Sequence, residues 1–240
     1  MSDRPPLHAM VDTPFDAIGF DLDGTLIDSF RDLGTAVNHA LALGGFSSVP
    51  MESSADLIGG GAKIMLAQAI NAQGGIPGGP EGDDFRSLYK AMLRFYSDNN
   101  AVHTAPYHHA RAVIDELTQA GIKCAVVTNK FEAFARSILT QLEFIDPFVT
   151  VIGGDSMGKG TDGVFLSKPH PEPVIEARQR CGAHRFAFIG DSSYDVKAAR
   201  AAGVPVVACS YGYCDAPAGE LGADAVIDSL DELIDTLAKL

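Results

Sequence analysis

The sequence has few basic residues, few cysteines and no long hydrophobic run, and each shortage excludes a class of protein. Its 18 lysines and arginines stand against 31 aspartates and glutamates, so the formal net charge is -13. Such a charge repels a nucleic-acid backbone, and no local cluster of lysine and arginine offsets it. We therefore expect no nucleic-acid partner.

The four cysteines are widely spaced, without a C-x-x-C pair or a histidine at zinc-site spacing. We interpret them as buried or incidental thiols. No stretch of about eighteen uninterrupted apolar residues occurs, and the first residues contain no apolar segment of a signal peptide. These features predict a cytoplasmic protein without a membrane partner. We expect residues 1–14 to form a flexible N-terminal tail.

Two patterns divide the rest of the chain. Over residues 29–103, apolar residues follow helical spacing, as in the run Leu33, Ala36, Val37 and Ala40, and no convincing strand appears. After residue 103, helices and apolar strands alternate, with strands expected at 122–129, 148–154, 185–191 and 204–210. An earlier apolar strand precedes Asp21.

Continuous apolar strands with helices between them predict a parallel sheet that is covered on both faces. The fold class we expect is α/β, a doubly wound parallel sheet with a Rossmann-like core and an inserted all-helical cap. Residues 15–28 and 104–240 would form the core, and residues 29–103 the cap. The sequence leaves the oligomeric state, monomer or homodimer, open.

Polar side chains collect after the predicted strands, and these are Asp21, Asp23, Thr128, Asn129, Lys168, Asp191 and Asp195. In an open parallel sheet, ligands bind beyond the carboxyl ends of the strands, so we expect these side chains to meet at one edge. Carboxylates that share a small site repel one another unless they are protonated or bind a cation. Carboxylate oxygens suit Mg²⁺, which in turn favours a phosphate-bearing substrate.

The stretch "FDLDGTLIDS" places Asp21 and Asp23 two residues apart, directly after the first strand. Asp21 fits a nucleophile that attacks phosphorus, and Asp23 fits a group that exchanges protons with the leaving and attacking oxygens. The turn at Gly24 would let the two side chains diverge around one substrate.

Four segments, "DLDGTLIDS", "VVTNK", "SKPHPEP" and "GDSSYDV", resemble in that order the four motifs of the haloacid dehalogenase superfamily. The chain is most similar to its phosphoglycolate phosphatase branch. The resemblance implies a Mg²⁺-dependent phosphomonoester hydrolase with a helical cap and an aspartyl-phosphate intermediate. It also implies a small phosphorylated metabolite as substrate, with 2-phosphoglycolate as the first guess.

The resemblance implies a role for each catalytic position. Asp21 would be the nucleophile, and Asp23 the general acid for the leaving alkoxide and then the base that activates water. Thr128 would donate a hydrogen bond to the phosphoryl oxygens, with Asn129 helping to position them. Lys168 would neutralise charge between Asp21 and phosphate.

The resemblance also implies a set of metal ligands. Asp21, Asp191 and the backbone carbonyl of Asp23 would bind Mg²⁺. Asp195 would support the metal or its water, or hold Lys168.

Substrate choice is expected in the cap. In "IGGGAKIML", Gly60 and Lys63 match the family's glycine-rich segment, and Lys63 would meet a substrate carboxylate; solvation at the surface is its simpler role. The chain departs from the family pattern at "GGIPGGPEGDD" and at "SMGKGTDGVFLS", the long connection before Lys168. Although residues 158–163 satisfy G-x-G-x-x-G, no helix is predicted to follow, so we interpret them as a flexible loop.

Two other functions remain open. A sugar phosphomutase of the same superfamily keeps both aspartates and differs in how the cap handles its substrate. A non-catalytic phosphoacceptor would keep the aspartyl pocket without turnover. Asp23 argues against this second alternative, since a pure phosphoacceptor needs no acid for a leaving group.

Overall fold

A parallel sheet forms the centre of the protein, in a computed structural model that describes residues 11, 13–50 and 61–240. Its strand order is β5-β4-β1-β6-β7-β8, and every pairing is parallel. The strands are β1 (Ala17–Phe20), β4 (Lys123–Val127), β5 (Phe148–Ile152), β6 (Phe186–Gly190), β7 (Val206–Cys209) and β8 (Ala225–Ile227). The first strand of the chain thus lies in the middle of the sheet, which confirms the doubly wound architecture.

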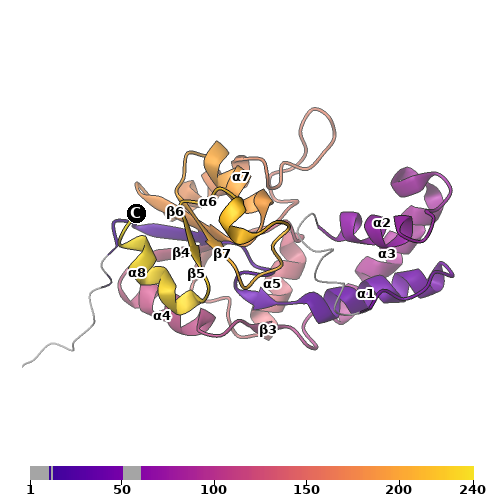
Figure 1. Cartoon of the computed structure of the whole chain (residues 1–240), viewed down its shortest axis with the longest axis horizontal. Coiled ribbons are helices and arrows are strands. Elements are labelled where there is room, and N and C mark those ends of the chain that lie inside the picture. Colours follow the sequence, from indigo (N-terminus) through magenta and orange to yellow (C-terminus); the bar gives the residue numbers. More distant parts are fainter. Residues whose placement is uncertain (1–10, 12, 51–60) are drawn as a thin grey trace, which may run out of the picture.

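Helices cover both faces of the sheet because its strands are apolar on both sides. Within β4, Cys124 and Val126 join one hydrophobic cluster, whereas Ala125 and Val127 join the other. The first cluster includes α4 (Ala110–Gln119), α5 (Glu132–Gln141) and α8 (Leu233–Leu237), and the second includes α6 (Glu172–Cys181) and α7 (Ser193–Ala201). Figure 1 shows α6 and α7 above the sheet, and α4 and α8 below it.

The structure differs from the sequence-based expectation at the C-terminal end. Strand β8 was not predicted, because it has three residues and only Ile227 is buried, so it leaves little periodic signal. After β8 the chain forms a 3-10 turn, Leu230–Glu232, followed by the short α8.

A helical cap lies beside the carboxyl ends of the strands, at the right of Figure 1. It contains α1 (Phe30–Leu43), α2 (Ala62–Asn71), a 3-10 turn (Gly79–Glu81) and α3 (Asp83–Asp98), with α1 packed against the other two helices. Over 29–50 and 61–103, no strand forms, as predicted. Residues 51–60 of the expected cap and most of the expected tail, 1–14, lie outside the described residues.

Two connections join the cap to the core, and they pair with each other. Strand β2 (Ile27–Asp28) precedes the cap, strand β3 (Ala105–Pro106) follows it, and the two are antiparallel. Asp32, in the first turn of α1, accepts hydrogen bonds from the backbone N–H of His103 and from both the N–H and the hydroxyl of Thr104. The buried Asp32 carboxylate therefore ties the entry of the cap to its exit.

All four cysteines are free thiols, and Cys214 is the one that is not buried. This agrees with their interpretation as buried or incidental side chains. Among the helices of the described residues, none has the length and apolar character needed to cross a bilayer.

We expect Asp32→Ala to lower the free energy of unfolding by about 2–4 kcal/mol, because two N–H groups and one hydroxyl lose their acceptor in a buried place. Denaturant unfolding followed by circular dichroism measures the change. Asp83→Ala is the matched control: Asp83 also lies in the first turn of a cap helix, but its side chain is 96% exposed. Equal stability of the two variants would contradict a clamping role for Asp32.

Candidate active site

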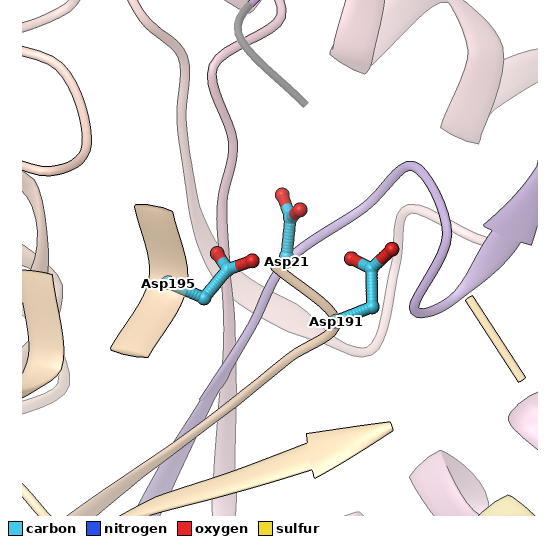
Figure 2. A group of neighbouring side chains, drawn as sticks. All are labelled: Asp21, Asp191 and Asp195. Atoms are coloured by element: carbon cyan, nitrogen blue, oxygen red, sulfur yellow. The ribbon is translucent and has the colours of Figure 1, made fainter. Parts of the chain in front are cut away.

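Three buried carboxylates meet at the carboxyl edge of the sheet. Asp21 directly follows β1, Asp191 directly follows the neighbouring β6, and Asp195 lies in the first turn of α7. One oxygen from each lies within 4.8 Å of the others. Figure 2 shows the three side chains beside one another, with the carboxylates of Asp21 and Asp191 extending to the same side. The sequence-based expectation that these strand ends converge is thus met for all three aspartates.

Two glycines make room for this cluster. Gly24 has a φ of +86°, and a Cβ there would lie 2.2 Å from Oδ2 of Asp191. A Cβ on Gly190 would lie 2.3 Å from Cγ of Asp195. The glycine that follows Asp23 and the glycine that precedes Asp191 are therefore required by the close approach of the carboxylates.

The cluster carries more negative charge than the protein itself compensates. Burial raises the pKa of Asp21 to about 7, although the Lys168 ammonium opposes this shift. Burial, followed by the neighbouring carboxylates of Asp195 and Asp21, raises the pKa of Asp191 well above its usual range. A bound divalent cation would relieve the repulsion, and three hard oxygen donors at this spacing fit Mg²⁺.

Lys168 is the buried cation of the site. Its Nζ lies 2.7 Å from Oδ1 of Asp21 and 2.6 Å from Oδ1 of Asp195. The contact with Asp21 is thus a close ion pair between buried groups. Although burial lowers the pKa of Lys168, the carboxylates of Asp195 and Asp21 outweigh it and raise the pKa to about 12, so the ammonium stays charged.

Both oxygens of Asp195 are already engaged. Oδ2 accepts hydrogen bonds from the N–H and the hydroxyl of Ser192, forming a capping box at the start of α7, and Oδ1 accepts one from Lys168. Of the two roles expected for Asp195, these contacts favour holding Lys168. As a metal ligand, Asp195 would have to share an oxygen with these donors.

Asp23 is held by a lysine that the sequence analysis did not single out. The Lys130 Nζ lies 3.1 Å from Oδ1 of Asp23, which also accepts a hydrogen bond from the Ser29 hydroxyl. Lys130 donates a second hydrogen bond, of 2.8 Å, to the hydroxyl of Tyr96 on α3. Burial lowers the pKa of Lys130, but Asp23 and Tyr96 outweigh it, and the net shift is upward. Lys130 follows Asn129 in "VVTNK", yet only the structure shows that its side chain is buried, with 6% exposed.

Thr128 and Asn129 follow β4 and reach the same site. The Thr128 hydroxyl accepts a hydrogen bond of 3.1 Å from the Lys130 N–H, which leaves its own hydrogen to donate. The Asn129 side chain donates a 3.0 Å hydrogen bond to the backbone oxygen of Lys168. This contact makes Asn129 a support for the Lys168 segment.

The loop after β7 also contributes to the site, which the sequence analysis missed. Asp191 accepts hydrogen bonds from the Thr25 hydroxyl (3.1 Å) and the Tyr213 N–H (2.7 Å). The Tyr213 hydroxyl accepts a hydrogen bond of 2.7 Å from the Ser29 N–H, just before α1. Thr25 lies in the first motif, so the sequence could have indicated that it belongs to the site. Tyr213 lies in no motif that would have indicated this.

A cavity of about 420 Å³ connects these residues to the cap. Its wall includes Asp21, Asp23, Thr128, Asn129, Lys168 and Asp191. Lys63 also lines it, but its ammonium forms a 2.6 Å ion pair with Glu81, and both side chains are largely exposed. That contact agrees better with the surface role than with a free substrate ligand. Gly60 lies outside the described residues.

Comparisons with known proteins agree with this geometry. Residues 18–209 match the family model described as haloacid dehalogenase-like hydrolase. A phosphoglycolate phosphatase of Nitrosospira multiformis is 35% identical over 94% of this chain and 97% of its own. That of Escherichia coli K12 is 32% identical over 92% and 91%.

Solved structures show the same fold. A crystal structure described as a predicted phosphoglycolate phosphatase from Haemophilus somnus superposes with a TM-score of 0.83 at 28% identity. The similarity covers 92% of this chain and 97% of that one, so both the sheet and the helical cap are included.

We expect Mg²⁺ to raise the unfolding temperature of the wild type, since a ligand at 100 times its Kd stabilises the folded state by about 2.7 kcal/mol. Asp191→Asn should lose most of this shift, because one charged oxygen donor is gone. Asp235→Asn, an exposed position on α8, should keep it. Thermal unfolding with and without Mg²⁺, with chelator as reference, gives the three shifts; an unchanged shift in Asp191→Asn would place the metal elsewhere.

Proposed function

The chain belongs to the haloacid dehalogenase-like hydrolases and is a phosphatase, and from this premise we propose that it is a Mg²⁺-dependent phosphomonoesterase that works through an aspartyl-phosphate on Asp21. One observation carries the proposal. The buried carboxylate of Asp21 lies 2.7 Å from the charged Lys168 ammonium, with a second aspartate two residues on. That combination offers a nucleophile, charge neutralisation and a proton carrier in one cavity.

In the first half of the reaction, an oxygen of Asp21 attacks phosphorus and the bond between phosphorus and the alcohol oxygen breaks. Asp23 gives its proton to the leaving alkoxide. Lys168 offsets the negative charge that Asp21 and the phosphoryl group bring together, and the Thr128 hydroxyl donates to a phosphoryl oxygen.

In the second half, Asp23 takes a proton from water, which attacks phosphorus and releases inorganic phosphate. Asp21 returns as a carboxylate, and the net reaction consumes one ester and one water to give alcohol and phosphate. Asp21, Asp191 and the backbone carbonyl of Asp23 would hold Mg²⁺, which would supply positive charge for the phosphoryl oxygens.

We propose that residues 29–103 act as the cap that covers the substrate. The names of the relatives make 2-phosphoglycolate the first substrate to test within the class of small phosphorylated metabolites. The cavity between the cap and the sheet edge supports a substrate of small-molecule size, since its volume lies in the usual range for such sites.

The surroundings of Asp23 favour turnover over a stable phosphoacceptor. Ser29 and Lys130 both contact Oδ1 of Asp23, so this carboxylate is oriented from two sides. A protein that only stored a phosphoryl group would have no use for an oriented proton carrier beside its nucleophile.

Phosphate release from a panel of esters tests the activity. With Mg²⁺, we expect turnover of at least one ester among 2-phosphoglycolate, nucleotides and hexose 1-phosphates, and loss of turnover with chelator. Asp21→Asn should reduce the rate by at least about a thousandfold, because the amide is not a nucleophile. Asp235→Asn serves as the matched control. Conversion of a hexose 1-phosphate to its 6-phosphate without phosphate release would instead show a mutase.

Asp23→Asn separates the two halves of the reaction with p-nitrophenyl phosphate, whose leaving group needs no acid. We expect a burst of nitrophenolate of about one per protein molecule. Steady-state turnover should then be about 100- to 10,000-fold slower than in the wild type, since water lacks its base. Rapid-mixing absorbance measures both phases. A steady-state rate equal to that of the wild type would remove Asp23 from the mechanism.

A further inference from the structure

The cavity above the reacting groups is walled mainly by apolar side chains. They come from the cap helices, from the start of α5 and from residues 158–166, and include Met65, Tyr89, Met92, Phe131, Phe134 and Phe165. A cavity of about 150 Å³ already holds a benzene ring. The 420 Å³ available here can therefore hold a ring together with a phosphoryl group.

Part of this wall belongs to the long connection before Lys168, where the chain departs from the family pattern. The sequence predicted an irregular loop there, but the structure shows a hairpin. The Gly160 N–H donates to the Val164 oxygen (2.8 Å), the Leu166 N–H donates to the Gly158 oxygen (3.0 Å), and Lys159 and Phe165 form a bridge. The hairpin thus holds Val164 and Phe165 in the cavity wall.

Aromatic rings extend the wall from the hairpin into the cap. The Phe165 ring lies edge-on to Phe131, with centroids 6.3 Å apart, and Phe131 lies 6.1 Å from Phe134. Phe134 in turn packs edge-on against Tyr96 at 5.5 Å. Such a chain of rings offers faces and edges to another ring. At the rim, Val164 is 58% exposed, and a ligand that covered it would gain from its burial.

The charged groups of the wall do not favour an anionic leaving group, so this inference departs from 2-phosphoglycolate, the substrate that the names of the relatives suggest. Each lysine among the described lining residues already has a carboxylate within 3.1 Å: Lys63 has Glu81, Lys130 has Asp23, and Lys168 has Asp21 and Asp195. No arginine occurs among those lining residues. An apolar leaving group needs none of these charges and uses the rest of the wall.

We propose that this cavity selects phosphomonoesters whose alcohol carries an apolar ring, and that Val164 and Phe165 of the hairpin are specificity-determining residues. The inference rests on the proposed phosphomonoesterase activity for its chemistry. The bond changes are those given above: the ester oxygen leaves with a proton from Asp23, and phosphate leaves after attack by water.

Benzyl phosphate and ethyl phosphate test the proposal. Both release an unactivated alkoxide, so their intrinsic reactivity is similar, and only benzyl phosphate carries a ring. We expect the wild-type kcat/KM to be about tenfold or more higher for benzyl phosphate, from burial of the ring. A kcat/KM for benzyl phosphate no higher than for ethyl phosphate would overturn the proposal, while turnover of either ester would leave the phosphatase assignment intact.

Truncating the wall should lower this preference without changing the chemistry. We expect Phe165→Ala to reduce the benzyl-to-ethyl ratio by about tenfold and Val164→Ala by about threefold, in proportion to the apolar surface removed. The matched control is Val149→Ala on β5, since Val149 is 51% exposed and lies outside the cavity. A ratio that stays at the wild-type value in Phe165→Ala would overturn the role of the hairpin.

Binding separates failure of this inference from failure of the proposed function. Benzylphosphonate and ethylphosphonate have no ester bond, so neither can be hydrolysed. With Mg²⁺ present, benzylphosphonate should bind about tenfold more tightly in calorimetry, and Phe165→Ala should remove the difference. If no ester is hydrolysed but benzylphosphonate binds more tightly, the proposed ring selectivity of the cavity is supported and the proposed phosphomonoesterase activity is contradicted. Equal binding of the two phosphonates would contradict the proposed ring selectivity of the cavity.

Discussion

Repulsion among buried carboxylates at the end of the central strands is the constraint on which the rest of the site depends. One oxygen each of Asp21, Asp191 and Asp195 lies within 4.8 Å of the others, and one lysine ammonium compensates only part of their charge. Because burial weakens the solvation of these carboxylates, their uncompensated negative charge raises their affinity for protons and also favours a divalent cation. The same imbalance makes the edge of the sheet suited to the metal and the phosphate of the function we propose.

Two lysines are the cationic partners of the carboxylates at this edge of the sheet. Lys168 is shared by Asp21 and Asp195, whereas Lys130 is paired with Asp23. The two aspartates of the first motif thus have different cations, although they are two residues apart. The nucleophile and the proton carrier that we propose need different environments, and the second and third motifs provide a lysine for each.

The core and the cap meet through Asp23, the residue that we propose as the acid and base. Lys130 contacts Asp23 on the core side and the Tyr96 hydroxyl on α3, while Ser29, at the entry to the cap, donates to the same aspartate. The position of α3 is therefore linked by direct contacts to the orientation of Asp23. In the function we propose, the groups at the sheet edge carry the chemistry, and the hairpin at 158–166 and the cap helices form the wall around the substrate.

The sequence by itself determined the sheet, the cap and the chemistry-bearing aspartates, because their signals are local. Five-residue segments made mostly of apolar residues mark β4, β5 and β6, and a carboxylate directly after a buried strand has few structural reasons to be there. Only the tertiary structure decided which side chains contact one another in the site. In the sequence nothing distinguishes Lys130 from a solvated lysine, whereas in the structure it contacts Asp23 and Tyr96. The Tyr213 N–H donates to Asp191, which lies 22 residues earlier in the chain. Strand β8 is too short to show a periodic pattern. Burial and pairing depend on what lies across the fold, and spacing along the chain does not encode that.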